Sequence, residues 1–356
     1  MVKLGDVINV HYGKALKADQ RVSNGSVHVF GSSGIVGNHD KTLCSYPTII
    51  IGRKGSVAAI TWAPSGGWII DTAYYVEIKD NNKLDLRYLF YILSGIDLTK
   101  KTITTSIPGL NRDDLYDTFI KLPPFEEQKR IVDLLDKAEG IRQKREQSIK
   151  LADDFLRATF ATMYGNPITN PKKWPVHLMG EIIEFKGGNQ PPKSDFIFEP
   201  KQGYIRLVQI RDFKSDKYAT YIPQEKAKRI FEVDDVMIAR YGPPVFQILR
   251  GLSGSYNVAL MKASPKENIR KGFIFYLLQL PEYHDVVVKN SERTAGQTGV
   301  NLELLNKFNV PLPPIYYQDE ILDRLARIEK FKEKIEISLN HLEIQFLSLQ
   351  KRLIGF

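Results

Sequence analysis

Several features that mark other classes of protein are scarce or missing in this chain of 356 residues. It has one cysteine, Cys44, so no disulfide can form within the chain, which is typical of a reducing compartment. The first ten residues mix Lys3, Asp6 and Asn9 with short apolar stretches and lack a signal-peptide core. No uninterrupted apolar run is long enough to span a bilayer. We therefore expect a soluble, cytoplasmic protein.

Catalytic motifs are also scarce. A methyltransferase of base amino groups needs Asp/Asn-Pro-Pro-Tyr/Phe, whose oxygen holds the amine, but here Leu122 and Leu312 precede the two Pro-Pro pairs. Asp71 with residues 77–79 resembles a magnesium nuclease site only weakly, and the second half does not repeat it. The glycine-rich segment 185–189 is not a nucleotide-binding fingerprint, and no histidines or cysteines have zinc spacing.

Positive charge is in excess. The chain has 50 Lys and Arg residues against 41 Asp and Glu, a net charge of +9. Such an excess favours polyanionic partners such as nucleic acid, although a solvated basic surface would give the same composition.

A long-range repeat is the strongest pattern present. Leu122-Pro123-Pro124, followed by Gln128 and Ile131, recurs 190 positions later as Leu312-Pro313-Pro314, followed by Gln318 and Ile321. Gly109-Leu110-Asn111 and Gly299-Val300-Asn301 repeat with the same spacing. A repeat of half the chain length predicts two related domains and not a solenoid of short units.

Each half begins with a mixed α/β pattern. In the first half, 47–52 and 68–70 are short β-rich runs, and 86–93 reads as a short helix after Asp85, a suitable N-cap. In the second half, 236–242 and 272–280 match the strand and the helix.

A long helix follows each mixed region. The first is predicted over about 126–160, with Pro-Pro at its start and Ile141 among its apolar positions. The second carries an apolar heptad stripe that only Lys332 interrupts: Ile321, Leu325, Ile328, Lys332, Ile335, Leu339, Leu342, Phe346, Leu349 and Leu353. Such a stripe favours coiled-coil packing, while an amphipathic helix lying on a globular core is the alternative.

The predicted fold class is therefore α+β. Two globular α/β domains, 1–122 and 166–311, are expected in a pseudo-two-fold arrangement. Two long antiparallel coiled-coil helices, within 123–165 and 312–356, are expected to separate them. A helix of roughly 35 residues is about 50 Å long, close to about 15 base pairs of DNA, as in a dimeric reader of separated half-sites.

Candidate DNA-binding residues gather near the repeat anchors and in the loops beside them. Arginine and glutamine can read guanine and adenine edges, and lysine and loop amides suit phosphate. Each alone could be a solvated surface residue. The candidates are Ser32, Ser33, Arg53, Lys54, Thr105, Ser106, Arg206, Gln209, Arg211, Arg240, Tyr241 and Gln297.

These motifs together resemble the specificity subunit of type I restriction–modification systems. The resemblance is carried by the doubled Leu-Pro-Pro-x-x-x-Gln-x-x-Ile at 122–131 and 312–321, by 29–37 and by 204–206, and it extends over essentially the whole chain. One departure is that Glu127, before the first glutamine, is replaced by Tyr317 in the second copy.

The resemblance implies two target recognition domains that each read half of a bipartite DNA sequence, with the helices setting the gap. It implies a chain without catalytic activity or bound cofactor. Two modification subunits would use S-adenosylmethionine, and any restriction subunits would use ATP and Mg²⁺. A self-sufficient methyltransferase or nuclease, and a coiled-coil adaptor without a DNA role, are the alternatives.

Overall fold

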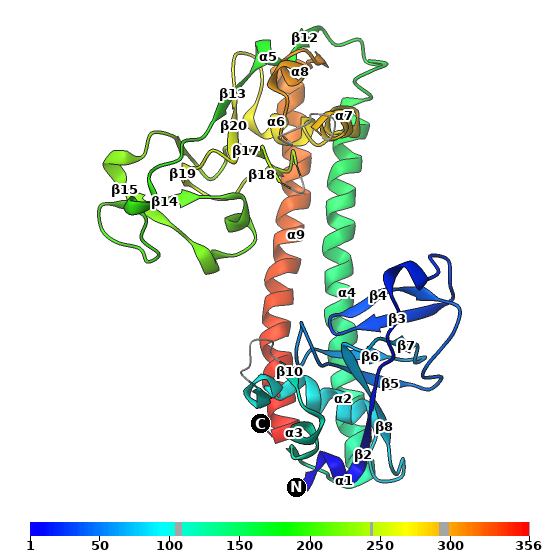
Figure 1. Cartoon of the computed structure of the whole chain (residues 1–356). Helices are drawn as coiled ribbons and strands as arrows, with labels where there is room; N and C mark the ends of the chain where they lie inside the picture. Colours follow the sequence, from blue (N-terminus) through cyan, green and yellow to red (C-terminus); the bar gives the residue numbers. More distant parts are fainter. Residues whose placement is uncertain (104–108, 243–244, 292–298, 356) are drawn as a thin grey trace. The chain divides into compact units, whose positions relative to one another are not determined.

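The computed structural model describes residues 1–103, 109–242, 245–291 and 299–355, and the chain divides into two compact units (Figure 1). Unit 1 comprises Met1–Gln147 and Glu336–Phe356, and unit 2 comprises Ser148–Ile335. The long helices α4 (Phe125–Tyr164) and α9 (Ile315–Gln350) each belong in part to both units. Among the described residues, no helix combines the length and apolar character needed to cross a membrane.

Unit 1 is built on two sheets. The larger is antiparallel, in the order β2-β8-β5-β6, and the smaller, β4-β3-β7, pairs β3 with β7 in parallel. The strands are β2 (Ile8–Tyr12), β3 (Val27–Gly31), β4 (Gly34–His39), β5 (Thr48–Gly52), β6 (Ile60–Ala63), β7 (Trp68–Ile69) and β8 (Ala73–Ile78). All five residues of β5 are buried, as expected of a central strand, and the predicted run at 47–52 is confirmed.

Short elements complete unit 1. They are β1 (Val2–Lys3), α1 (Leu4–Val7), α2 (Leu86–Gly95), β9 (Thr102–Ile103), β10 (Gly109–Leu110), α3 (Arg112–Tyr116) and β11 (Phe119–Ile120). The Asp85 carboxylate accepts a hydrogen bond from the Tyr88 N–H, so the predicted N-cap of the short helix is confirmed. The buried face of α2 packs into a core shared with β2, β5, β8 and the start of α4.

Unit 2 repeats this plan in the same strand order. Its first sheet is antiparallel β13-β20-β17-β18, and its second, β15-β14-β19-β16, pairs β14 with β19 in parallel. The strands are β13 (Ile183–Gly187), β14 (Tyr204–Val208), β15 (Tyr221–Pro223), β16 (Ile230–Phe231), β17 (Val236–Ala239), β18 (Ile248–Leu249), β19 (Gly254–Tyr256) and β20 (Leu260–Pro265). Strands β13, β14, β17 and β19 therefore correspond to β2, β3, β5 and β7.

The remaining elements of unit 2 are β12 (Val176–Leu178), α5 (Met179–Ile182), α6 (Lys271–Leu277), α7 (Pro281–Ser291), α8 (Leu302–Asn306) and β21 (Asn309–Pro311). Helix α6 is the predicted second short helix, although it ends earlier than expected. Helix α7 follows it and was not predicted. Pro281 begins α7, consistent with the preference of proline for the first turn of a helix.

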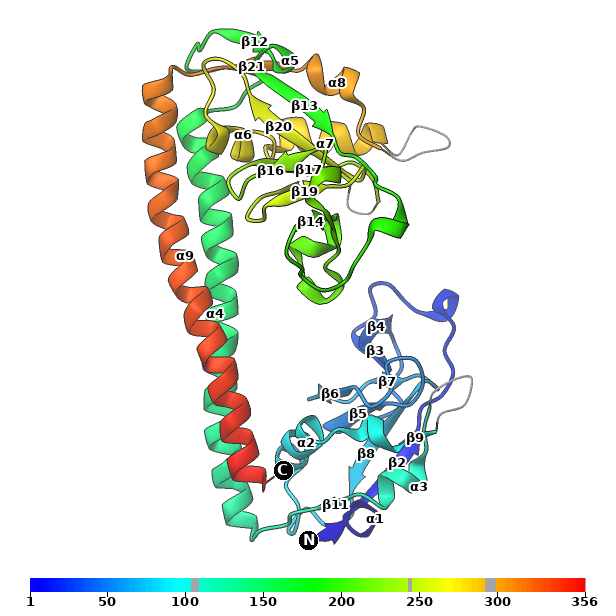
Figure 2. The same cartoon turned by 90° about the vertical axis from the view of Figure 1, so that its left-hand side faces the viewer.

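Within each unit, a stretch of α4 lies beside a stretch of α9 (Figures 1 and 2). Every predicted stripe position of α9 from Ile321 to Leu349 is buried or half-buried, so the heptad prediction is confirmed. In unit 2 the direction is antiparallel, because Tyr164 at the end of α4 bonds Pro311, just before α9, while Asp153 pairs with Lys332. A turn of π-helix, Lys351–Gly355, follows α9.

The prediction that Ile141 belongs to the apolar stripe of the first long helix is wrong. Its side chain is 48% exposed, and Arg142 is half-buried instead. Arg142 lies 190 positions before Lys332, so both helices carry a cation at the same place in the stripe. Lys332 donates to Asp153 across the helix pair at 2.6 Å, which explains how a charged residue is accommodated among apolar ones.

The repeated glutamine holds each long helix to its own unit. The Gln128 amide donates to the Lys83 and Pro123 carbonyls at 2.7 and 2.9 Å and accepts from the Asp85 N–H at 2.9 Å. In unit 2 the Gln318 amide makes three equivalent bonds, to Asn268, Pro313 and Arg270, each 2.8 Å long. Both glutamines have no exposed surface. Each one therefore joins the helix start to the segment that leads into the short helix of its unit.

Candidate nucleic-acid interface

In unit 1 the predicted residues lie where two strands end. Ser32 and Ser33 form the turn between β3 and β4, and Arg53 and Lys54 directly follow β5. These two segments are in contact, because a Cβ at Gly52 would lie 2.8 Å from the Ser32 carbonyl oxygen. The structure therefore brings together all four of these predicted residues in unit 1.

Arg53 takes part in an aromatic cluster at this edge. Its guanidinium lies 5.1 Å from the ring centre of Tyr12 and 5.8 Å from that of Tyr74, and it donates to the Asp71 carbonyl at 3.2 Å. The Arg112 guanidinium lies 5.2 Å from the ring centre of the same Tyr12. Tyr12 is 48% exposed, so unit 1 presents an aromatic ring flanked by two guanidinium groups.

In unit 2 the end of β14 carries the corresponding group. Arg206 lies within β14, and Gln209 and Arg211 follow it, with Arg211 in the short 3₁₀ segment Ile210–Phe213. Arg206 donates to the exposed Asp216 carboxylate at 2.7 Å, and the Arg206 side chain is only 18% exposed. Arg206 is thus held in place by its ion pair with Asp216. A phosphate of DNA could take the place of the Asp216 carboxylate in that pair.

Buried Asp212 organises this segment. Its carboxylate accepts from the Gln209 N–H at 2.8 Å, while its other oxygen lies 3.9 Å from the Arg211 Nε. Burial raises the pKa of Asp212, and the hydrogen bond from Gln209 opposes that rise. The local fold therefore fixes the backbone from which the side chains of Gln209 and Arg211 extend.

Tyr218 presents a second exposed ring in unit 2. It is 56% exposed, and its ring centre lies 5.5 Å from the Arg211 guanidinium and 5.3 Å from the Lys217 ammonium. Each unit thus carries an exposed tyrosine between two cations, although at different places. Aromatic rings and cations together suit the bases and phosphates of nucleic acid.

Arg240 and Tyr241 follow β17, at the place that Arg53 and Lys54 occupy after β5. The Arg240 guanidinium lies 5.0 Å from the Tyr241 ring centre, and its Nε is buried without a partner in the described part of the chain. Tyr241 forms an isolated bridge with Gly299, as Lys54 does with Gly109. The end of β17 is therefore tied to the second Gly-x-Asn anchor as the end of β5 is to the first.

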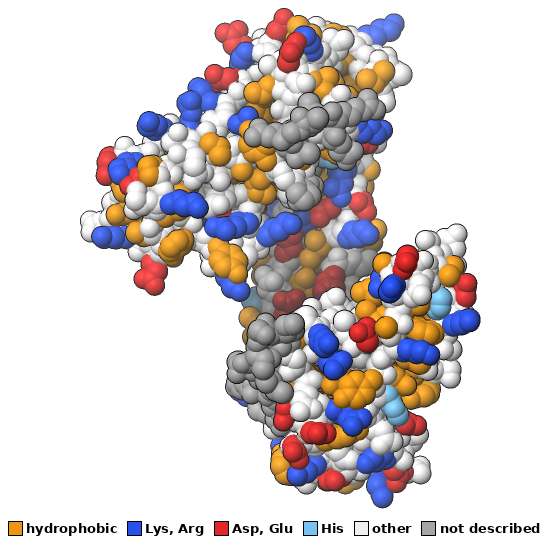
Figure 3. Space-filling model, in the orientation of Figure 1, with side chains coloured by type: hydrophobic (Ala, Val, Ile, Leu, Met, Phe, Trp, Pro, Cys, Tyr) orange, Lys and Arg blue, Asp and Glu red, His pale blue; other side chains and the backbone are white. Residues whose placement is uncertain are grey.

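The remaining predicted residues, Thr105, Ser106 and Gln297, lie outside the described residues. They precede the two Gly-x-Asn anchors in sequence. On unit 2, Figure 3 shows several Lys and Arg side chains along the face over β14 and β18. None of the predicted contacts to DNA is tested by this geometry, so all of them stay predictions.

Sequence reasoning missed Tyr12, Arg112, Lys217 and Tyr218. Arg112 could have been suspected, because it directly follows the first Gly-x-Asn anchor. The other three had no signal, since only the fold places Tyr12 beside Arg53 and Tyr218 beside Arg211. In the part of the chain that the structure describes, no group of three His, Cys, Asp or Glu side chains could hold a metal ion.

Comparison with known proteins gives one consistent result. The family model described as "Type I restriction modification DNA specificity domain" matches residues 1–151 and 171–343. The chain is 22% identical to the type I restriction enzyme EcoBI specificity subunit of Escherichia coli, covering 83% of this chain and 70% of that protein. It is 21% identical to the MjaVIII specificity subunit of Methanocaldococcus jannaschii, covering 74% and 69%.

Solved structures agree on the fold. The crystal structure of a type I restriction–modification S subunit from M. genitalium is similar with a TM-score of 0.58 at 16% identity, covering 99% of this chain and 95% of that one. A chain from a structural study of complex assembly and conformational transition of a type I system has a TM-score of 0.56 at 19% identity, with 99% and 97% covered.

Proposed function

We propose, from the premise that this chain belongs to the type I restriction–modification DNA specificity family, that it reads a bipartite DNA target with one unit per half-site. The membership follows from the matched residues 1–151 and 171–343 and confirms the predicted resemblance. The relatives are named specificity subunits, which are the non-catalytic components of their complexes.

One observation supports the assignment of one half-site to each unit. The two units share a strand order, and in both of them candidate DNA-binding residues follow the same two strands. The residues themselves differ, with Ser32 and Arg53 in unit 1 and Gln209 and Arg240 in unit 2. An equal scaffold with unequal side chains suits two different DNA sequences, because base edges are read by side chains.

Specificity subunits of type I systems function in complexes with DNA and other subunits. For this chain we propose two modification subunits, which would transfer the methyl group of S-adenosylmethionine. Restriction subunits that use ATP and Mg²⁺ would join them where they exist. The chain itself would hold no cofactor and would act in the cytoplasm, where its DNA lies.

The direct test is to purify the chain with its modification subunits, methylate genomic DNA and sequence the modified sites. We expect two short motifs separated by a gap of constant length. A single continuous motif would contradict the proposal of two readers. The chain alone should transfer no methyl group and cleave no DNA, and activity of the chain alone would favour a self-sufficient enzyme.

Duplex binding by the chain separates the proposal from a coiled-coil adaptor. Binding should weaken steeply with salt, because each phosphate contact releases counterions. An adaptor without a DNA role would show no salt-dependent binding to the duplex.

Arg240→Ala should change recognition in one half-site only. Loss of one bidentate base contact costs about 1–3 kcal/mol of discrimination, or about 5- to 150-fold, at one base pair. The measurement is the sequence of methylated sites for the variant complex. Arg53→Ala is the matched control, since it follows the equivalent strand in unit 1 and should affect the other half-site. An unchanged motif with Arg240→Ala would remove Arg240 from the interface.

A further inference from the structure

The two units share one small frame, in which two short helices pack against each other beside the first strand of the first sheet. In unit 1 the helices are α1 and α3, and in unit 2 they are α5 and α8. The bonds that hold the frame are the same in each: Leu4 N–H to the Thr118 carbonyl and Met179 N–H to Phe308 at 2.8 Å, and Lys79 Nζ to Gly5 and Lys266 Nζ to Gly180 at 2.6 Å. Differences inside this frame can therefore be compared residue by residue.

In unit 1 the frame is closed by Tyr116, the last residue of α3. A Cβ added at Gly5 would lie 3.0 Å from the Cβ of Tyr116, so Tyr116 packs directly against α1. Its hydroxyl accepts a hydrogen bond from the Val10 N–H at 2.9 Å. Val10 lies in β2, the edge strand of its sheet, so the side chain of Tyr116 satisfies a backbone donor at that edge.

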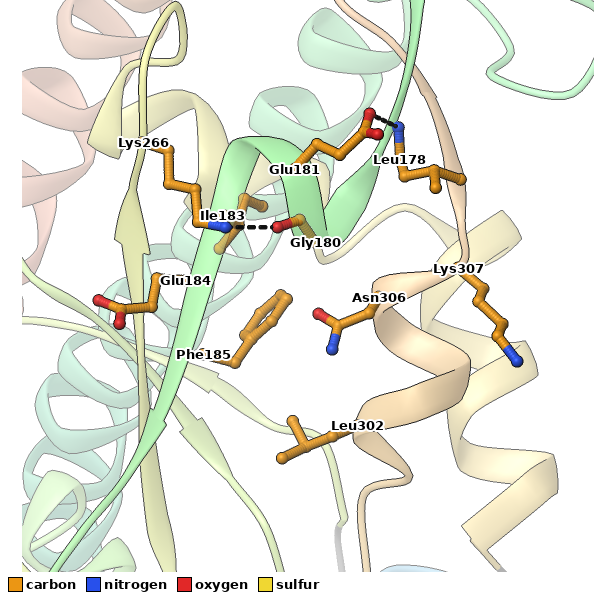
Figure 4. A pocket seen from close by; sticks show the side chains of 10 residues that line it. All are labelled: Leu178, Gly180, Glu181, Ile183, Glu184, Phe185, Lys266, Leu302, Asn306 and Lys307. Carbon is orange, nitrogen blue, oxygen red and sulfur yellow. Dashed lines mark hydrogen bonds between the residues drawn. The ribbon is translucent and has the colours of Figure 1, made fainter.

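In unit 2 the same place holds Asn306, the last residue of α8. Its Cβ would lie 2.9 Å from a Cβ at Gly180, so it occupies the Tyr116 position. The shorter side chain leaves a pocket of about 490 Å³. Figure 4 shows Asn306, Leu302 and Phe185 around one space between α8 and β13.

The backbone N–H of Phe185 in β13 is a hydrogen-bond donor at the open edge of the sheet, where the pocket lies. The bonds from Lys266 N–H to Ile182 and from Gly188 N–H to Leu260 show that even-numbered residues of β13 bond to β20. Phe185 therefore points its N–H away from β20, at the open edge, as Val10 does in unit 1. In the described part of the chain this N–H has no hydrogen-bond partner.

The side chains that line the pocket indicate which kind of ligand it can bind. Phe185 and Leu302 are apolar, while Glu181 and Glu184 are balanced by Lys266 and Lys307. A site with equal numbers of acidic and basic groups selects neither an anion nor a cation. It suits a neutral ring that carries one polar atom able to accept from the Phe185 N–H.

We propose that this pocket binds a tyrosine side chain from another subunit of the restriction–modification complex. Its ring would lie against Phe185 and Leu302, and its hydroxyl would accept from the Phe185 N–H, as Tyr116 does from Val10 in unit 1. The proposal rests on the proposed function only for the source of the tyrosine. The recognition of a phenol ring rests on the repeat.

The first experiment uses the whole chain and the probe N-acetyltyrosinamide, followed by saturation-transfer NMR. We expect the probe to bind, and N-acetylphenylalaninamide to bind about 2- to 10-fold more weakly, because it lacks one hydrogen bond. Asn306→Tyr should abolish binding and raise the melting temperature, since the new ring fills the pocket. Asn306→Ala should retain binding.

The reciprocal change is the matched control. Tyr116→Asn should open an equivalent pocket in unit 1 and so increase the amount of probe bound per chain. Equal binding of the two probes would overturn the role of the hydroxyl. Probe binding that survives Asn306→Tyr would place the site elsewhere, and a lowered melting temperature for Asn306→Tyr would mean that Phe185 already fills the space.

The source of the tyrosine is tested with the modification subunits. Asn306→Tyr should reduce their affinity for the chain at least about tenfold, the loss expected when one buried aromatic anchor is excluded. Asn306→Ala should not. Equal affinity of the wild type and Asn306→Tyr would overturn these subunits as the source. Duplex binding by the chain alone should be the same in both variants, which keeps this result separate from the test of DNA recognition.

Discussion

Replacing Gln318 with leucine is expected to destabilise unit 2 by about 3–5 kcal/mol. The side chain is fully buried and makes three hydrogen bonds, with Asn268, Pro313 and Arg270. Leucine would fill most of the volume but leave one backbone N–H and two carbonyl groups without this partner. The bond to Pro313 is buried and its loss costs about 1–3 kcal/mol, while the part-buried bonds to Asn268 and Arg270 cost about 1 kcal/mol each. Urea denaturation, followed by amide hydrogen exchange in α6 and the start of α9, measures the effect.

Gln128→Leu is the matched variant, because its side chain makes the same three bonds in unit 1. It should increase exchange in α2 and the start of α4 and leave unit 2 protected. Exposed Gln143 provides a control, and Gln143→Leu should change the free energy of unfolding by less than about 0.5 kcal/mol. A loss below about 1 kcal/mol in Gln318→Leu would show that water or a rearranged backbone satisfies the three groups.

Inserting one heptad into both long helices is expected to lengthen the gap between the recognised half-sites by about three base pairs. Seven helical residues add about 10.5 Å, and DNA rises about 3.4 Å per base pair. The division of the chain suggests where to insert: after Gln147 in α4 and after Ile335 in α9. Sequencing of methylated DNA gives the new gap directly.

A heptad in α4 alone is the control for this experiment. It would lengthen only one of the two helices that connect the units, so the stripes could not stay in register on both sides of the insertion, and complex formation and methylation should fall sharply. The double insertion should restore methylation with the longer gap. Restored methylation at the original gap would mean that the helices do not set the spacing.

Much of the architecture could be predicted because it follows from local patterns. The heptad stripe of α9 and the diproline starts of both long helices are periodic or positional signals, and the structure confirms the helices. The apolar stripe of α4 was harder to predict, since the Arg142 side chain is half-buried and that of Ile141 is exposed. Hydrophobicity favoured the wrong residue, because the Arg142 guanidinium is paired on its own helix with the carboxylates of Glu139 and Glu146.

The candidate interface was less accessible to sequence reasoning. Arg53 and Arg240 could be selected because each follows a β-rich run near a repeat anchor. Tyr12 and Tyr218 could not, because an exposed tyrosine has no distinctive local pattern. Lys217 directly precedes Tyr218, but the three arginines beside these rings come from other elements or loops. Only the folded chain brings the guanidinium groups of Arg53, Arg112 and Arg211 to 5.1, 5.2 and 5.5 Å from the ring centres.

By itself, the sequence determined the duplication, the two long helices and the family, because these depend on repeated spacing and on periodicity that no distant contact can alter. Only the tertiary structure decided what the repeated glutamine does, since its three partners lie on segments 5 to 50 positions away. The same holds for Lys332, which finds Asp153 only once the helices pair. It also holds for the pocket at Asn306, which exists because one short side chain meets an open strand edge. The fold brings Gln318 and Lys332 to partners distant in sequence and leaves the strand edge at Phe185 open, so none of these roles follows from a local pattern.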